Sequence, residues 1–184
     1  MRRFITVENI PQKVLITDDP MRAAMLSSHY LNDSRLIGDL RGMKAYYGTF
    51  KGIPVALISC GFGETAVELY LTEAYGAGGR DFVYLGECVS ADGTRELMDI
   101  ITDINSVYTN DRYFINGEVS DGFSIVDFAV NRFTETAERL GAASAFFLVA
   151  AECAATGKRI EDSVRQSRLT EAAEKALSML VKSF

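Results

Sequence analysis

The chain has 184 residues and a formal net charge of −6, from 25 acidic and 19 basic residues. Hydrophobic residues make up 48% of it, enough for a sizeable core in a single domain over residues 1–184. The acidic balance argues against nucleic acid as a partner, and no apolar run is long enough for a membrane span. Because the N-terminal residues also lack the apolar stretch of a secretion signal, we expect a cytoplasmic protein.

The cysteines and the histidine do not form a metal-binding or disulfide pattern. Cys60, Cys88 and Cys153 are far apart in the sequence, and His29 is the single histidine. We therefore expect three buried free thiols, with no metal and no other cofactor.

The predicted elements alternate between strands and helices. A buried strand over residues 13–17 leads through Asp18 and Asp19 into a helix that Pro20 begins and that runs over 21–30. The later elements are a hairpin of strands 46–50 and 53–59, a helix over about 64–75, a strand over 81–85 ending at Gly86, a helix over 124–140, a strand over 145–150 and an amphipathic helix over 161–184. This order favours a three-layer α/β/α sandwich with a mixed sheet.

Ligands in such folds bind at the carboxyl ends of the strands. The predicted strands place four loops there: residues 17–20, 59–63, 86–88 and 151–153. Residues 90–123 show no clear pattern, so the site is expected to be built from those four loops.

Five segments in and around these loops resemble motifs of the purine nucleoside and uridine phosphorylase family. They are TDDPMRA (17–23, the family's G-D-P-x-R-A), the hairpin 41–52 (R-G-M…G-x-Y-K-G), CGFG (60–63, G-M-G), YLGEC (84–88, R-x-G-[ST]-[CA]) and VDFAVN (126–131, V-E-M-E-A-A). Their shared order makes the resemblance specific. It fails between about 90 and 123, where the family carries several tens more residues.

The resemblance implies a phosphorylase/hydrolase-like fold, a nucleoside or related ribosyl compound as ligand, and a homo-oligomer, either a dimer or a hexamer of dimers. In the family, phosphate cleaves the ribosyl N-glycosidic bond. Arg22 and Arg41 correspond to phosphate-binding arginines, the second acting in a neighbouring subunit. Glu152 falls on the aspartate that protonates the leaving base, and Arg165, 13 residues later, falls on the arginine that partners this aspartate. Phe62 takes the place of a methionine that packs against the sugar.

Several family residues are replaced here. In the phosphate pocket a glycine has become Asp18, an arginine has become Tyr84 and a serine has become Glu87. The pocket thus loses one positive charge and gains two negative ones. Because each carboxylate within about 4 Å of a phosphate costs on the order of a few kcal/mol, phosphorolysis is disfavoured. The ribose-binding glutamate has become Ala129, and Ala151 stands in place of the serine before the catalytic acid.

Two interpretations of the new carboxylates remain open. Asp18 and Glu87 can pair with Arg22 and Arg41 and form a structural ion-pair cluster. Alternatively, one of the two carboxylates acts as a general base that deprotonates water, with Glu152 as the acid.

The function predicted first is therefore cleavage of a ribosyl N-glycosidic bond in nucleoside metabolism, with water rather than phosphate. The alternative is a non-catalytic nucleoside-binding or structural homologue. The catalytic candidates are Glu152, Arg165, Glu87 and Asp18, and the substrate-binding candidates are Arg22, Arg41, Phe62, Phe128 and Asp127. A pocket lined by Phe62, Phe128 and Glu152 would favour binding or catalysis, and one closed by Asp18–Arg22 or Glu87–Arg41 pairs would favour a structural role.

Overall fold

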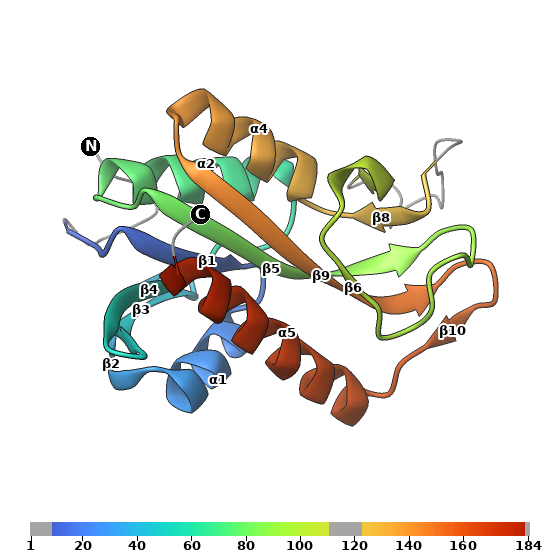
Figure 1. Ribbon diagram of the computed structural model, residues 1–184, viewed down its shortest axis with the longest axis horizontal. Coiled ribbons are helices and arrows are strands. Elements are labelled where there is room, and N and C mark those ends of the chain that lie inside the picture. The colour runs from blue at the N-terminus through green and yellow to red at the C-terminus, as the bar shows by residue number, and fades with distance from the viewer. Residues whose placement is uncertain (1–8, 111–122, 183–184) are drawn as a thin grey trace.

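The computed structural model describes residues 9–110 and 123–182 (Figure 1). The N-terminal eight residues, the predicted end of the last helix at 183–184 and much of the stretch without a clear pattern lie outside these ranges.

The described chain forms a mixed sheet whose central strands are parallel (Figure 1). The main path follows the order β10-β9-β5-β1-β4-β3-β2. Its strands are β1 (Lys13–Thr17), β2 (Asn32–Leu40), β3 (Met43–Phe50), β4 (Ile53–Ser59), β5 (Asp81–Ser90), β9 (Ala143–Cys153) and β10 (Lys158–Arg159). β1 pairs in parallel with β4 and β5, and β5 pairs in parallel with β9. Short strands β6 (Ile100–Ile101), β7 (Val107–Thr109) and β8 (Ile125–Asp127) join at the β5 and β9 end, next to a 3₁₀ turn (Ile104–Ser106).

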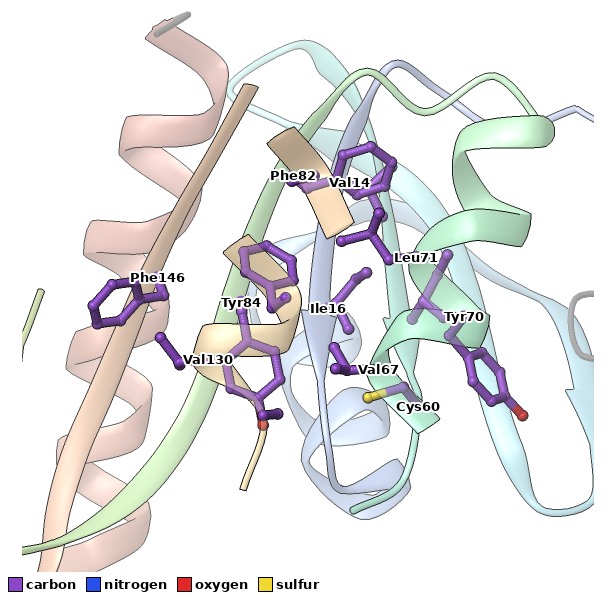
Figure 2. Packing of buried hydrophobic residues seen from close by; sticks show 14 of the residues in the cluster. Val14, Ile16, Cys60, Val67, Tyr70, Leu71, Phe82, Tyr84, Val130 and Phe146 are labelled. Atoms are coloured by element: carbon purple, nitrogen blue, oxygen red, sulfur yellow. The ribbon is translucent and has the colours of Figure 1, made fainter. Parts of the chain in front are cut away.

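Helices cover both faces of the sheet, which confirms the predicted sandwich. α1 (Pro20–Tyr30) and α5 (Asp162–Lys182) lie on one face, and α2 (Glu64–Gly76) and α4 (Val130–Leu140) lie on the other (Figure 1). Alternate residues of a strand face opposite layers. Val14 and Ile16 of β1 accordingly pack in the α2/α4 layer, as Figure 2 shows, whereas Leu15 packs with α1 and α5. No helix in the described ranges is long and apolar enough to cross a membrane.

The junction of β1 and α1 follows the prediction. The Asp19 side chain accepts a hydrogen bond of 2.7 Å from the Met21 N–H, and Pro20 lies in the first turn. Aspartate is a favoured cap and proline is preorganised for this position. Because α1 begins directly after Asp19, Arg22 in its first turn lies near the end of β1 and reaches the Thr17 hydroxyl.

Strand ends near the site differ from the prediction. β5 continues through Gly86 to Ser90, and β9 spans 143–153 rather than 145–150, because the two strands pair along their whole length. Glycine fits inside β5 since a Cβ at Gly86 would lie 2.7 Å from the Tyr84 ring. Glu87 and Glu152 therefore project from paired strands and not from loops.

One further expectation about the elements was wrong, and one strand was not predicted. The helix predicted over 124–140 begins only at Val130, and Ile125–Asp127 form β8, which pairs with the end of β5. The edge strand β2 was missed because its side chains are largely polar and exposed.

Candidate functional site

A buried ion-pair cluster lies at the carboxyl end of β1, beside Glu87 of β5. Arg22, only 7% exposed, forms a close ion pair with Asp18 and a second one of 2.5 Å with Glu87. Its Nη1 also donates a hydrogen bond of 3.1 Å to the Thr17 hydroxyl. The guanidinium therefore bonds the two carboxylates that replace the family's glycine and serine. The predicted Asp18–Arg22 pair is present.

Glu87 lies between two arginines. Its second oxygen is 3.6 Å from Nη1 of Arg165, which also pairs with Asp162 at 3.1 Å. Burial raises the pKa of Glu87, and the positive charges of Arg22 and Arg165 oppose that rise. The sequence suggested Arg41 as the partner of Glu87, and the structure supplies Arg22 and Arg165 instead.

Glu152 also has a different partner from the predicted one. Its Oε2 lies 2.8 Å from Nε of Arg159, with which it forms an ion pair. Because β9 continues to Cys153 before the chain turns, β10 places Arg159 directly opposite Glu152. The structure thus replaces the expected Glu152–Arg165 pair with Glu152–Arg159 and Glu87–Arg165.

A pocket of about 90 Å³ has both glutamates among its lining residues. It is lined by Glu87, Cys88, Val89, Phe128, Ala151 and Glu152. The Phe128 ring contacts the ring of Phe62, with centroids 5.3 Å apart, and Phe62 is 65% exposed. The predicted residues Glu87, Glu152, Phe128 and Phe62 are therefore brought together.

Asp127 was predicted to bind the substrate, but its side chain lies inside the fold. The side chain is fully buried and accepts hydrogen bonds from the Thr109 hydroxyl at 2.5 Å and from the N–H groups of Ala129 and Val130. It caps α4, whose start the sequence placed too early. Burial raises the Asp127 pKa to about 6, and these hydrogen bonds oppose the shift.

Arg41 occupies the exposed turn between β2 and β3 with a φ of 57°. Its charge opposes the rise that burial causes in the pKa of Tyr70 on α2. A contact of Arg41 with a neighbouring subunit stays a prediction.

Tyr84, which replaces a family arginine, is part of the core. Its ring lies 5.6 Å from that of Phe133 and, in Figure 2, beside Val130 of α4. The position has thus changed from a charged ligand-binding residue to an apolar packing residue. All three cysteines are buried free thiols, as predicted.

Sequence reasoning missed Arg159 and the strand residue Val89, whereas Cys88 lies in one of the four segments expected to build the site. A usable signal for Arg159 was the Thr156-Gly157 turn directly after a strand, since Gly157 has a positive φ of 66°. A hairpin there would have predicted a cross-strand partner for Glu152. Among residues 9–110 and 123–182 we find no group of three or more His, Cys, Asp or Glu side chains arranged to hold a metal.

The chain is similar in sequence to known purine nucleoside phosphorylases. No protein-family model matches the chain. A DeoD-type purine nucleoside phosphorylase from Colwellia psychrerythraea is 30% identical over 138 residues, which cover 71% of this chain and 56% of that protein. A second from Clostridium novyi is 34% identical over 95 residues, covering 50% and 40%. The chain spans about half the length of the curated relatives it matches.

The fold has a close match among solved structures. Uridine phosphorylase from Vibrio fischeri superposes with a TM-score of 0.81, covering 99% of this chain and 98% of that one at 14% identity. A structure of the same enzyme with 6-hydroxy-1-naphthoic acid gives a TM-score of 0.75. The sequence matches and the shared fold confirm the predicted resemblance to the nucleoside phosphorylases.

Proposed function

We propose that this protein cleaves the N-glycosidic bond of a nucleoside or related ribosyl compound with water. The observation that carries the proposal is a pocket whose lining includes two glutamates, Glu87 and Glu152. Hydrolysis of a glycosidic bond commonly uses such a pair, one as acid and the other as base. Kinship with the nucleoside phosphorylases supports a role in nucleoside metabolism.

The ion pairs that Arg22 already forms with two carboxylates favour water over phosphate as the attacking molecule. Its guanidinium already bonds Asp18 and Glu87, so a phosphate would have to displace a carboxylate and then remain beside it. Each such like-charged contact costs on the order of a few kcal/mol. A neutral water molecule meets no such repulsion.

The chemical roles follow the motif positions, since Glu152 falls on the family's catalytic acid and Glu87 lies in the pocket where the family binds phosphate. Glu87, whose pKa is raised by burial, accepts a proton from water as the water oxygen bonds to the anomeric carbon. The bond from that carbon to the base nitrogen breaks, and Glu152, which binds the substrate in its protonated form, donates that proton to the departing nitrogen. Arg22 and Arg165 hold the Glu87 carboxylate from two sides.

The size of the pocket limits what it encloses. Its volume of about 90 Å³ is below that of a cavity of about 150 Å³ that accommodates benzene. The pocket therefore takes the reacting part of the sugar, and the base lies outside against the exposed Phe62 ring.

Phe62→Ala is expected to raise KM about 5- to 100-fold with little change in kcat, because stacking of a base on an aromatic ring contributes about 1–3 kcal/mol. Steady-state kinetics measure this. Met21→Ala, which removes another exposed apolar side chain, is the control and should leave KM unchanged. An unchanged KM in Phe62→Ala would place the base elsewhere.

The proposed activity is tested by chromatography of bases released from a panel of purine and pyrimidine nucleosides, with and without phosphate. We expect release that needs no phosphate, reduced about 10²- to 10⁴-fold in Glu87→Gln and in Glu152→Gln. Glu138→Gln, on the exposed side of α4, is the matched control. Release that depends on phosphate, or that survives both substitutions, would overturn the proposal.

The alternative is a nucleoside-binding homologue without catalysis. It is favoured by the closed Asp18–Arg22–Glu87 cluster, since all three side chains already satisfy one another. Calorimetric binding of a nucleoside without any base release would identify this alternative.

A further inference from the structure

The arginines around the pocket have partners that the family motifs do not suggest. We propose that Arg159, and not Arg165, is the positioning residue for Glu152, so that the β9–β10 hairpin orients the carboxyl group facing the pocket. The inference rests on the proposed function for its catalytic consequence.

The hairpin geometry makes Arg159 and Glu152 a cross-strand pair. β10 runs antiparallel to β9, with Arg159 opposite Glu152 and Lys158 opposite Cys153. Directly opposite side chains project on the same face of a sheet, where they interact. The pair is closed by the 2.8 Å contact from Nε of Arg159, and the Ile160 N–H donates to the Ala151 carbonyl at 3.0 Å beside it.

Arg165 is engaged elsewhere. Its two terminal nitrogens pair with Glu87 at 3.6 Å and with Asp162, a residue of its own helix, at 3.1 Å. The two carboxylates of the pocket are thus held from different elements, Glu87 by α1 and α5, and Glu152 by the hairpin.

Orientation matters because Glu152 must present its carboxyl group to a leaving nitrogen at hydrogen-bond distance. A glutamate has three rotatable side-chain bonds, and an ion pair at one oxygen restricts them while leaving the other oxygen for the ligand. Arg159 is 75% exposed, so its contribution falls as salt screens the pair.

Kinetics of matched variants test the inference. Arg159→Gln is expected to lower kcat about 10- to 100-fold with KM changed less than about threefold, and Arg159→Lys to restore most of it. Arg159→Gln should have no further effect in the Glu152→Gln background, whereas Arg165→Gln should still lower the residual rate. Lys158→Gln removes the same charge one residue away, on the opposite face of β10, and should match the wild type.

A spectroscopic measurement separates this inference from the proposed function. In ¹H–¹⁵N NMR spectra, the Nε–H signal of Arg159 should shift and exchange faster with water in Glu152→Gln and stay unchanged in Glu87→Gln. If the Arg165 signals respond to Glu152→Gln instead, or if the kinetic coupling falls on Arg165, the inference is wrong. If the Arg159 signal responds and no nucleoside is cleaved, the proposed function fails while Arg159 remains the partner that fixes Glu152.

Discussion

Replacement of Arg22 by methionine is expected to lower the free energy of unfolding by about 3–5 kcal/mol at pH 7, as measured by urea denaturation. The substitution keeps the apolar volume of the side chain but removes the buried cation. Asp18, whose side chain is 3% exposed, is then left beside Glu87 without its partner. Breaking a buried ion pair by removing one member has a penalty of this size because a charge stays buried without compensation.

Two further variants show whether the unpaired charge causes the loss. Asp18→Asn combined with Arg22→Met should recover part of the stability, since one buried negative charge is removed with the positive one. Arg132→Met removes a partly exposed arginine that pairs with glutamates on α2 and α4, and should cost less than about 1 kcal/mol. A loss below about 1 kcal/mol in Arg22→Met would mean that water already solvates the cluster.

The second large effect is a pH-dependent difference in the free energy of unfolding between Asp127→Asn and the wild type. Relative to the wild type, Asp127→Asn is expected to gain about 2–3 kcal/mol of stability as pH rises from 4 to 7. In the folded protein the Asp127 pKa is about 6, above its ordinary value of 3.8. The protonated carboxyl is therefore favoured by folding: its stabilisation is present below about pH 4 and is lost as pH rises through 6. Asparagine does not titrate and shows no such loss.

Urea denaturation of both proteins across this pH range gives the difference directly, because the other titrating groups cancel. Asparagine is also a good helix cap and can still accept from the Ala129 and Val130 N–H groups. A stability difference that is independent of pH would show that Asp127 is ionised without penalty in the fold.

The central part of the fold could be predicted from the sequence because its signals are local. The apolar run 13–17 followed by Asp19 and Pro20 specifies a strand, a cap and a helix start within eight residues. The extended ends of β5 and β9 could not be predicted, since their pairing joins residues about 60 positions apart along the chain. A glycine at 86 is typical of a strand end, and here long-range pairing overrides that local preference.

The sequence predicted which residues line the candidate site better than it predicted which of their side chains pair with each other. Glu87, Glu152 and Phe128 line one pocket as their motif positions suggest. Pairing among charged side chains depends on angles that a sequence pattern does not encode, so the partners of Glu87 and Glu152 were assigned wrongly. Asp127 was misassigned for a local reason, because Ile125–Asp127 looked helical and form a strand.

The uneven length of the strands around β5 has a consequence for how the pocket responds to a ligand. β1 ends opposite Leu85 and the pairing with β8 starts only at Val89, while β9 pairs with β5 along its whole length. Between Leu85 and Val89, the β5 backbone pairs with β9 along one edge, and among the described residues no strand pairs with its other edge. Glu87 lies on this stretch, whose backbone is held by its pairing with β9. Under the proposed function, a ligand beside Glu87 therefore meets a fixed backbone on which only side-chain rotamers adjust, so selectivity is set by shape and charge rather than by loop closure.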